Sequence, residues 1–263
     1  MGFNPVLWRD KWYVVVALLL LLPLATEIGY LIGVRKSGRI SAEFRALAGT
    51  TEAALLALVG LLLGFSFVMT TSRYEIRKQL VIREANSIGT SYLRADVLPA
   101  ADAQAVRALF REYVDTRIRM AESAEDIDVL EQGVAESARI QDAIWTRAIA
   151  AARMDPHAIT FGLLLQSIND VIDLHTQRAM AVEDRLPGMV LVMLFGATAA
   201  SLGVTGFGRG LGERRGIFLT IILIFVLATV LLVILDLDRP RGGFIHVSQQ
   251  AMYSLRDSIR ARP

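Results

Sequence analysis

The chain has 263 residues, of which 54% are hydrophobic, and its mean hydropathy is +0.46. This composition is too apolar for an ordinary soluble domain and indicates a membrane protein. The absence of cysteine excludes disulfides, thiolate metal sites and thiol nucleophiles. The net charge is +2, but residues 72–188 hold 14 Lys and Arg against 18 Asp and Glu, so the polar part is acidic. A nucleic-acid-binding part would be basic, so nucleic acid is not an expected partner.

Four apolar runs are long enough to cross a lipid bilayer, which takes about 20 residues. They cover residues 12–34, 53–71, 187–207 and 217–235. Continuous runs of this length predict helices, because backbone polar groups in lipid must bond within their own segment. We therefore expect two membrane parts, residues 1–71 and 187–235, each with two transmembrane helices.

Residues 72–186 separate the two membrane parts, and their pattern predicts a soluble helical domain. Their apolar residues recur at spacings of three and four, and no strand alternation occurs. The expected helices are a continuation of the second run that ends at Leu98, followed by 102–122, 126–153 and 157–184. Residues 236–263 predict a turn and a short amphipathic tail. The predicted fold class is all-α.

Four crossings would place both termini and the helical domain on one side of a cell membrane. Two short loops, 35–52 and 208–216, would lie on the opposite side. Both sides carry Lys and Arg near the membrane, and their balance favours cytoplasmic termini. The expectation is a multi-pass protein of a cell membrane with a cytosolic helical domain.

Three carboxylates near the membrane are candidate ion contacts. Glu27 lies inside the first run, where a carboxylate costs about 2.5 kcal/mol or more and should face protein or water. It could contact an ion or proton, or it could reach the headgroups. Asp236 and Asp238 end the fourth run and could bind a cation, pair with a nearby arginine or simply lie at the interface. Two carboxylates are too few for a tight Ca²⁺ site, which takes about six to eight oxygens.

No motif for catalysis, a cofactor or a metal is recognisable. The three histidines, at 157, 175 and 246, are scattered. Asp170, Asp173 and His175 share one predicted helix, which is more typical of a solvated or interhelical polar face than of a metal site. A phosphate-binding loop, a dinucleotide fingerprint and a nucleophile elbow are all absent. We therefore expect no enzyme activity, no cofactor and no metal.

Small residues cluster on the third run: Gly196, Ala197, Ala200, Ser201 and Gly203. Their spacing predicts a face on which another helix packs closely.

The stretch "LLLGFSFVMTTSRYEIRKQ", residues 61–79, passes from apolar to charged sequence with no Pro or Gly at the join. It predicts one helix that leaves the bilayer and continues into water. Ala57, Leu61 and Phe65 are spaced by four and share a stripe on this helix. If several copies surround an axis, the stripe could form a hydrophobic constriction that gates by dewetting. Alternatively, it packs against the other three spans.

The segment "GFSFVMTTSRYEIRKQLVIREANSIG" resembles the second transmembrane helix of bestrophin ion channels and their bacterial relatives. The matching residues are Gly64, Phe65, Arg73, Tyr74, Glu75, Arg77 and Lys78. Two further segments resemble bacterial proteins described as bestrophin-like. They are "LDLDRPRGGFIHVS" and "EANSIGTSYLRADVLP", and the second begins at Glu84 and includes Asn86 and Gly89.

This resemblance implies a homopentamer in which the second span of each subunit lines a pore for inorganic ions. Ala57, Leu61 and Phe65 would then form the neck. Ala57 is smaller than the residues that the channels prefer, and only Asp236 and Asp238 stand where the animal channels have an acidic calcium clasp. A different class of function also fits: a non-conducting membrane sensor or scaffold whose cytosolic helices dock a partner.

Overall fold

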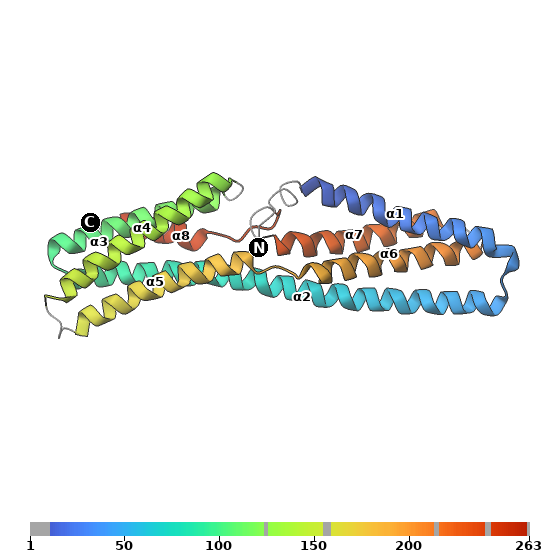
Figure 1. Ribbon diagram of the computed structural model, residues 1–263, viewed down its shortest axis with the longest axis horizontal. Coiled ribbons are helices and arrows are strands. Elements are labelled where there is room, and N and C mark those ends of the chain that lie inside the picture. The colour runs from blue at the N-terminus through green and yellow to red at the C-terminus, as the bar shows by residue number, and fades with distance from the viewer. Residues whose placement is uncertain (1–10, 124–125, 155–158, 213–215, 240–242, 262–263) are drawn as a thin grey trace. The chain divides into compact units, whose positions relative to one another are not determined.

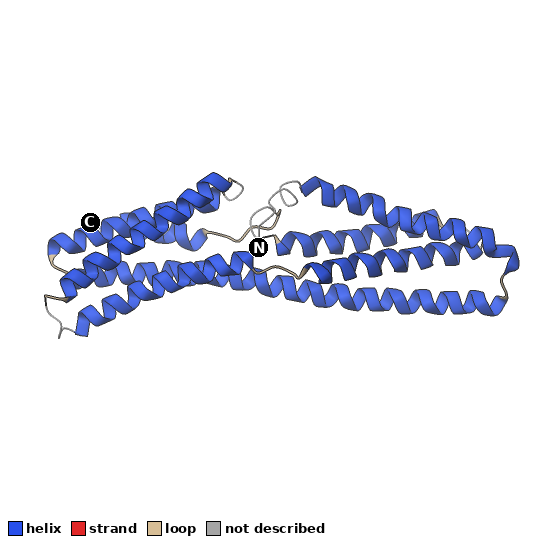
Figure 2. Ribbon diagram, viewed as in Figure 1, coloured by secondary structure: helices blue, strands red, loops and turns tan. Residues whose placement is uncertain are grey.

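The computed structural model describes residues 11–123, 126–154, 159–212, 216–239 and 243–261, and within these residues all regular structure is helical (Figure 2). The helices are α1 (Lys11–Lys36), α2 (Ala42–Arg94), α3 (Ala100–Glu122), α4 (Ile127–Ala152), α5 (Ile159–Glu183), α6 (Gly188–Leu211), α7 (Ile217–Asp238) and α8 (Gln250–Arg260). Short 3-10 turns at Ser37–Arg39 and Ala95–Val97 adjoin α2. The predicted all-α class is confirmed.

Four helices, α1, α2, α6 and α7, contain segments that are long and apolar enough to cross a membrane. This agrees with the four predicted spans and with a multi-pass membrane protein. The largest difference is at the start of α2, which begins at Ala42 rather than near residue 53. Residues 42–52 are helical because they contain several good helix formers, and because the Ser41 hydroxyl oxygen accepts the backbone N–H of Phe44 at 3.3 Å, as a cap does.

The chain folds into two compact units (Figure 1). The membrane unit comprises the described residues of Met1–Ser72 and Arg185–Ile245 and holds α1, the first part of α2, α6 and α7. The second unit comprises those of Arg73–Asp184 and His246–Pro263 and holds the rest of α2, α3, α4, α5 and α8. Helix α2 is unbroken where the two units adjoin in sequence, as the charge pattern predicts.

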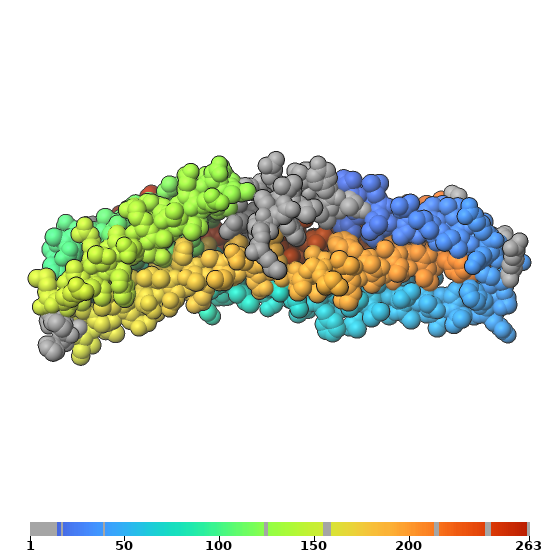
Figure 3. Space-filling model, in the orientation of Figure 1, coloured from blue at the N-terminus to red at the C-terminus, as the bar shows by residue number. Residues whose placement is uncertain are grey.

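Glycines bring α1 and α6 together inside the membrane unit. A Cβ placed on Gly206 would overlap the carbonyl oxygen of Thr26, and one on Gly210 would overlap that of Tyr30. Atoms of α1 accordingly lie directly against those of α6 over part of their length (Figure 3). Because lipid supplies no hydrophobic drive between helices, such close backbone approach is what holds two spans together.

The predicted small-residue face of α6 is therefore used, and its close contacts extend beyond the predicted cluster. A Cβ placed on Gly29 of α1 would overlap the carbonyl oxygen of Gly203. Gly203 approaches the carbonyl oxygen of Ala25, whereas a Cβ on Gly196 would meet nothing within 4 Å. Gly206 and Gly210, one and two turns beyond the predicted cluster, make similarly close contacts with α1.

The second unit has its own hydrophobic core, contributed by each of its helices. Its central residues are Val81, Ile88, Tyr92, Val106, Phe110, Val114, Ile140, Ile144, Leu164, Ile168, Val171, Met252 and Ile259. Gly89 of α2 leaves room for α8, since a Cβ there would stand 3.2 Å from Leu255 Cδ1. The C-terminal tail thus packs as a helix, α8, on the core of this unit.

Candidate functional site

The predicted stripe lies on a face of α2 that the described part of its own chain leaves largely exposed. Ala57 is exposed, Leu61 is 55% exposed and Phe65 is 66% exposed. The residues of α2 that pack into the membrane unit lie on another face, where Val59 and Leu63 are buried. The stripe therefore does not pack against the other described spans, which was the alternative that the sequence left open.

Gly64 lies on the same uncovered side of α2. It is exposed, and a Cβ on it would meet no atom within 4 Å. Nothing within the described chain therefore requires glycine at this position.

Two arginines of the family motif hold α2 to the end of α5. Arg77 is buried and donates to the carbonyl oxygens of Ala181 and Asp184 at 3.0 and 2.9 Å. Arg73 Nε lies 3.3 Å from Asp184 Oδ2. The last carbonyls of a helix lack partners within it and carry partial negative charge, so Arg77 satisfies and stabilises the end of α5.

The other motif residues in the charged part of α2 lie near the surface. The Tyr74 hydroxyl donates to the carbonyl oxygen of His246 at 3.4 Å. The Glu75 carboxylate accepts hydrogen bonds from Gln79 and Lys78 of the same helix at 2.9 and 3.4 Å.

Asn86 is exposed in a shallow groove between α2 and α5. Arg83 lines the α2 side of this groove, and Asp170 and Asp173 line the α5 side. This agrees with the predicted solvated polar face for these two aspartates.

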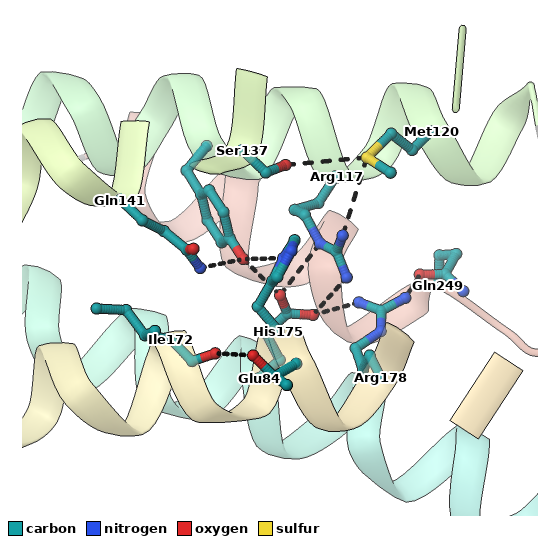
Figure 4. Close-up of polar contacts among 11 residues, drawn as sticks. Glu84, Arg117, Met120, Ser137, Gln141, Ile172, His175, Arg178 and Gln249 are labelled. Atoms are coloured by element: carbon teal, nitrogen blue, oxygen red, sulfur yellow. Dashed lines mark hydrogen bonds and ion pairs between the residues drawn. The ribbon is translucent and has the colours of Figure 1, made fainter. Parts of the chain in front are cut away.

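A buried polar network surrounds another motif residue, Glu84 (Figure 4). We call it the Glu84 cluster; its members are Glu84 of α2, Tyr113 and Arg117 of α3, Gln141 of α4, His175 and Arg178 of α5, and Gln249 just before α8. Glu84 is 0% exposed. A fully buried carboxylate is tolerated only when its oxygens are well paired, so its partners define the local structure.

Both carboxylate oxygens of Glu84 are bonded more than once. Oε1 accepts the Tyr113 hydroxyl at 2.8 Å and lies 3.1 Å from Arg117 Nε. Oε2 lies 3.4 Å from Arg117 Nη2 and also accepts Nη1 of Arg178. One side chain of α2 is thereby bonded to two other helices at once.

An outer layer of weaker contacts surrounds this centre. Gln141 Nε2 donates to the Tyr113 hydroxyl oxygen at 3.2 Å, and His175 Nδ1 lies 3.2 Å from the same oxygen. Arg178 also donates to Gln249 Oε1 at 3.4 Å. The segment before α8 is thus joined to the cluster as well.

The environment shifts the protonation equilibria of the cluster. Burial raises the pKa of Glu84, but the attraction of Arg117 and Arg178 and the hydrogen bonds from Arg178 and Tyr113 outweigh burial, so the pKa lies below its ordinary value. Burial, followed by the repulsion of Arg117, lowers the pKa of His175 to about 4. Burial and the Glu84 charge raise the pKa of Tyr113. Near neutral pH the cluster therefore holds one carboxylate, two guanidinium groups and a neutral imidazole.

The proposed ion-contact carboxylates have different surroundings. Asp236 accepts the backbone N–H groups of Phe244 and Ile245 at 2.7 and 2.8 Å, and the buried Asp238 accepts that of Leu186 at 2.8 Å. Both therefore fix the chain where it leaves α7 and enters α6. Glu27 is exposed on α1. Among the described residues, no three His, Asp or Glu side chains are grouped so as to hold a metal ion.

Sequence reasoning singled out Glu84 only through the family motif and did not identify its partners. A signal was present: Arg117 follows Phe110 and Tyr113 at helical spacing on the buried face of α3. Glu84 likewise lies between Val81 and Ile88 on the buried face of α2. A charged residue on an apolar face indicates a buried partner, but the pattern does not say which one.

Comparison with known proteins identifies the fold. A family model described as the Bestrophin-like domain matches residues 19–252. Crystal structures of a bacterial bestrophin homologue from Klebsiella pneumoniae are similar, and the one solved by Zn-SAD phasing gives a TM-score of 0.68 at 13% identity, covering 92% of this chain and 97% of that one. A mutant form of the same homologue gives a TM-score of 0.69 at 12% identity, covering 93% and 98%. No curated protein sequence matches the chain significantly.

Proposed function

Since the chain belongs to the Bestrophin-like family, we propose that it forms an oligomeric ion channel. The hydrophobic neck of this channel is formed by Ala57, Leu61 and Phe65 of α2. The observation that carries the proposal is the exposure of this stripe: within the described residues, two large apolar side chains, Leu61 and Phe65, are more than half exposed.

An apolar stripe on one chain becomes a constriction only when copies surround an axis. We propose a homopentamer in which α2 of every subunit turns the stripe inward. A narrow apolar ring excludes water until it widens, and this gives a gate without any charged group. The resemblance of the α2 motif to bestrophin ion channels supports this arrangement.

Symmetry is the first test of the proposal. Purified protein in detergent, imaged as single particles, is expected to show five-fold particles with α2 at the axis. A monomer or a two-fold dimer would contradict the neck.

The second test is ion flux from liposomes. Phe65→Ala removes the largest side chain of the stripe, so we expect it to change flux by about threefold or more by widening the constriction. Phe225→Ala is the matched control, because Phe225 of α7 is also exposed, at 68%, but is not on α2. Equal flux from wild type and Phe65→Ala would count against the neck.

A non-conducting scaffold remains the second candidate function. It is favoured by one observation: Met154, just after α4, and Ile159, the first residue of α5, are large apolar residues exposed in the second unit. Such residues could contact a partner. Symmetric particles that carry no flux under any ion gradient would favour this alternative.

A further inference from the structure

Helix α2 carries both the proposed neck and Glu84. Among the described helices it alone contributes to both compact units (Figure 1). Whatever fixes α2 in the second unit therefore acts on the helix that bears Leu61 and Phe65. The apolar residues that α2 contributes to the core of this unit, such as Val81 and Ile88, bury one face of the helix, but each dispersion contact is non-directional.

The bonds of Glu84 are directional. Its two carboxylate oxygens are shared by Tyr113 and Arg117 of α3 and by Arg178 of α5 (Figure 4). A rotation of α2 about its axis would move the carboxylate away from these donors. Because Glu84 is fully buried, water could not replace the lost bonds, so such a rotation is strongly opposed.

Glu84 supplies the negative charge on which the charge balance of the cluster depends. One carboxylate serves two guanidinium groups, and the neighbouring imidazole is neutral. Nη1 of Arg117 donates to the thioether sulfur of Met120 at 3.8 Å, and a thioether is a weak acceptor. Neutralising Glu84 would leave two buried positive charges beside each other with no counter-charge.

We propose that Glu84 is a positioning residue for the channel: by bonding α2 to α3 and α5 it fixes the rotation of α2, and with it the direction in which the stripe faces. An effect of Glu84 on ion flux rests on the proposed function. Its effect on the orientation of α2 is independent of that function and can be measured separately.

The measurement uses a single thiol on the stripe. The chain has no cysteine, so Leu61→Cys introduces a unique probe. In liposomes, the rate at which a water-soluble thiol reagent modifies this probe depends on where α2 faces. We expect the added substitution Glu84→Gln to change that rate several-fold and to change the flux of the protein that lacks the probe, with the oligomer still intact by size.

The matched control is Glu131→Gln, the same substitution at an exposed residue of α4. It should leave the labelling rate and flux as they are. If Glu84→Gln lowers the melting temperature but leaves labelling and flux unchanged in assembled protein, the cluster only stabilises the unit and the inference is overturned.

Two further outcomes are decisive. If the wild type carries no flux but Glu84→Gln still changes labelling, the positioning role stands and the channel proposal fails. If Glu84→Gln does not assemble, Tyr113→Phe replaces it, because it removes one hydrogen bond to Glu84 and leaves all three charges in place. A smaller change in labelling rate is then expected, and none at all contradicts the inference.

Discussion

At the scale of single residues, the Glu84 cluster shows how a buried charge is kept. Removing two guanidinium groups and a carboxylate from water is unfavourable, and their mutual attraction offsets this only with good geometry. Here each carboxylate oxygen has at least two partners. The stability lost on substitution should therefore depend on which member of the cluster is replaced.

The two ion-pair partners should differ in their effect on stability. Glu84→Gln leaves two unpaired buried charges and is expected to lower the free energy of unfolding by about 3–5 kcal/mol. Arg178→Met leaves a balanced pair of Glu84 and Arg117 and should cost about 1 kcal/mol. Thermal unfolding followed by the fluorescence of Trp145, which packs against this core, measures both. Equal losses from the two variants would show that charge balance does not matter here.

His175 predicts a specific dependence of stability on pH. Its pKa in the folded protein is about 4, whereas an unfolded histidine titrates near about 6.5. Between these values the unfolded chain binds more protons, so stability falls as pH drops through this window. Glu84 acts in the same direction at lower pH, because its pKa is also lowered. Tyr113 and Arg117 of α3, and Glu84 of α2, face the imidazole.

The test compares the melting temperatures of wild type and His175→Gln from pH 7 to pH 4. The imidazole is only partly buried, so its contribution, screened by solvent, is about 1 kcal/mol. The wild type should lose that stability relative to the variant as the pH falls. Parallel curves would mean that His175 titrates normally.

At the scale of elements, glycine decides which spans can pack closely. Contact between α1 and α6 depends on Gly206 and Gly210, where any Cβ would overlap the backbone of α1. By contrast, α2 keeps Gly60 and Gly64 on an open face. The chain thus uses glycine for packing on α6 but not, within one subunit, on α2.

Gly206→Ala should separate α1 from α6. The added methyl group overlaps a carbonyl oxygen that cannot move away without shifting the helix, and such overpacking typically costs about 1–3 kcal/mol. Gly196→Ala on the same helix meets open space and should leave stability unchanged or raise it slightly. Thermal unfolding in detergent measures the difference, and a similar loss from both variants would contradict this account.

At the scale of the whole molecule, the predicted membrane orientation can be tested with introduced thiols. Gly38→Cys places a thiol in the turn between α1 and α2, and Glu131→Cys places one on α4. If the helical domain is cytoplasmic, an impermeant reagent should label the first in intact spheroplasts and the second only after permeabilisation. The opposite pattern would reverse the orientation.

The sequence by itself determined the helices, the four apolar spans and the continuity of α2. These properties depend on local patterns, namely apolar run length, three-and-four spacing and stop signals such as Pro99, and a local pattern can be seen without a fold. It also placed Ala57, Leu61 and Phe65 on one stripe, because their spacing fixes a common helix face.

Only the tertiary structure decided which polar groups meet. Glu84 bonds to Arg117, 33 residues away, and to Arg178, 94 residues away. No periodicity connects positions on different helices, because their pairing depends on how the helices pack. For the same reason only the fold showed that Asp236 bonds to backbone N–H groups and that the stripe of α2 is left uncovered by its own chain.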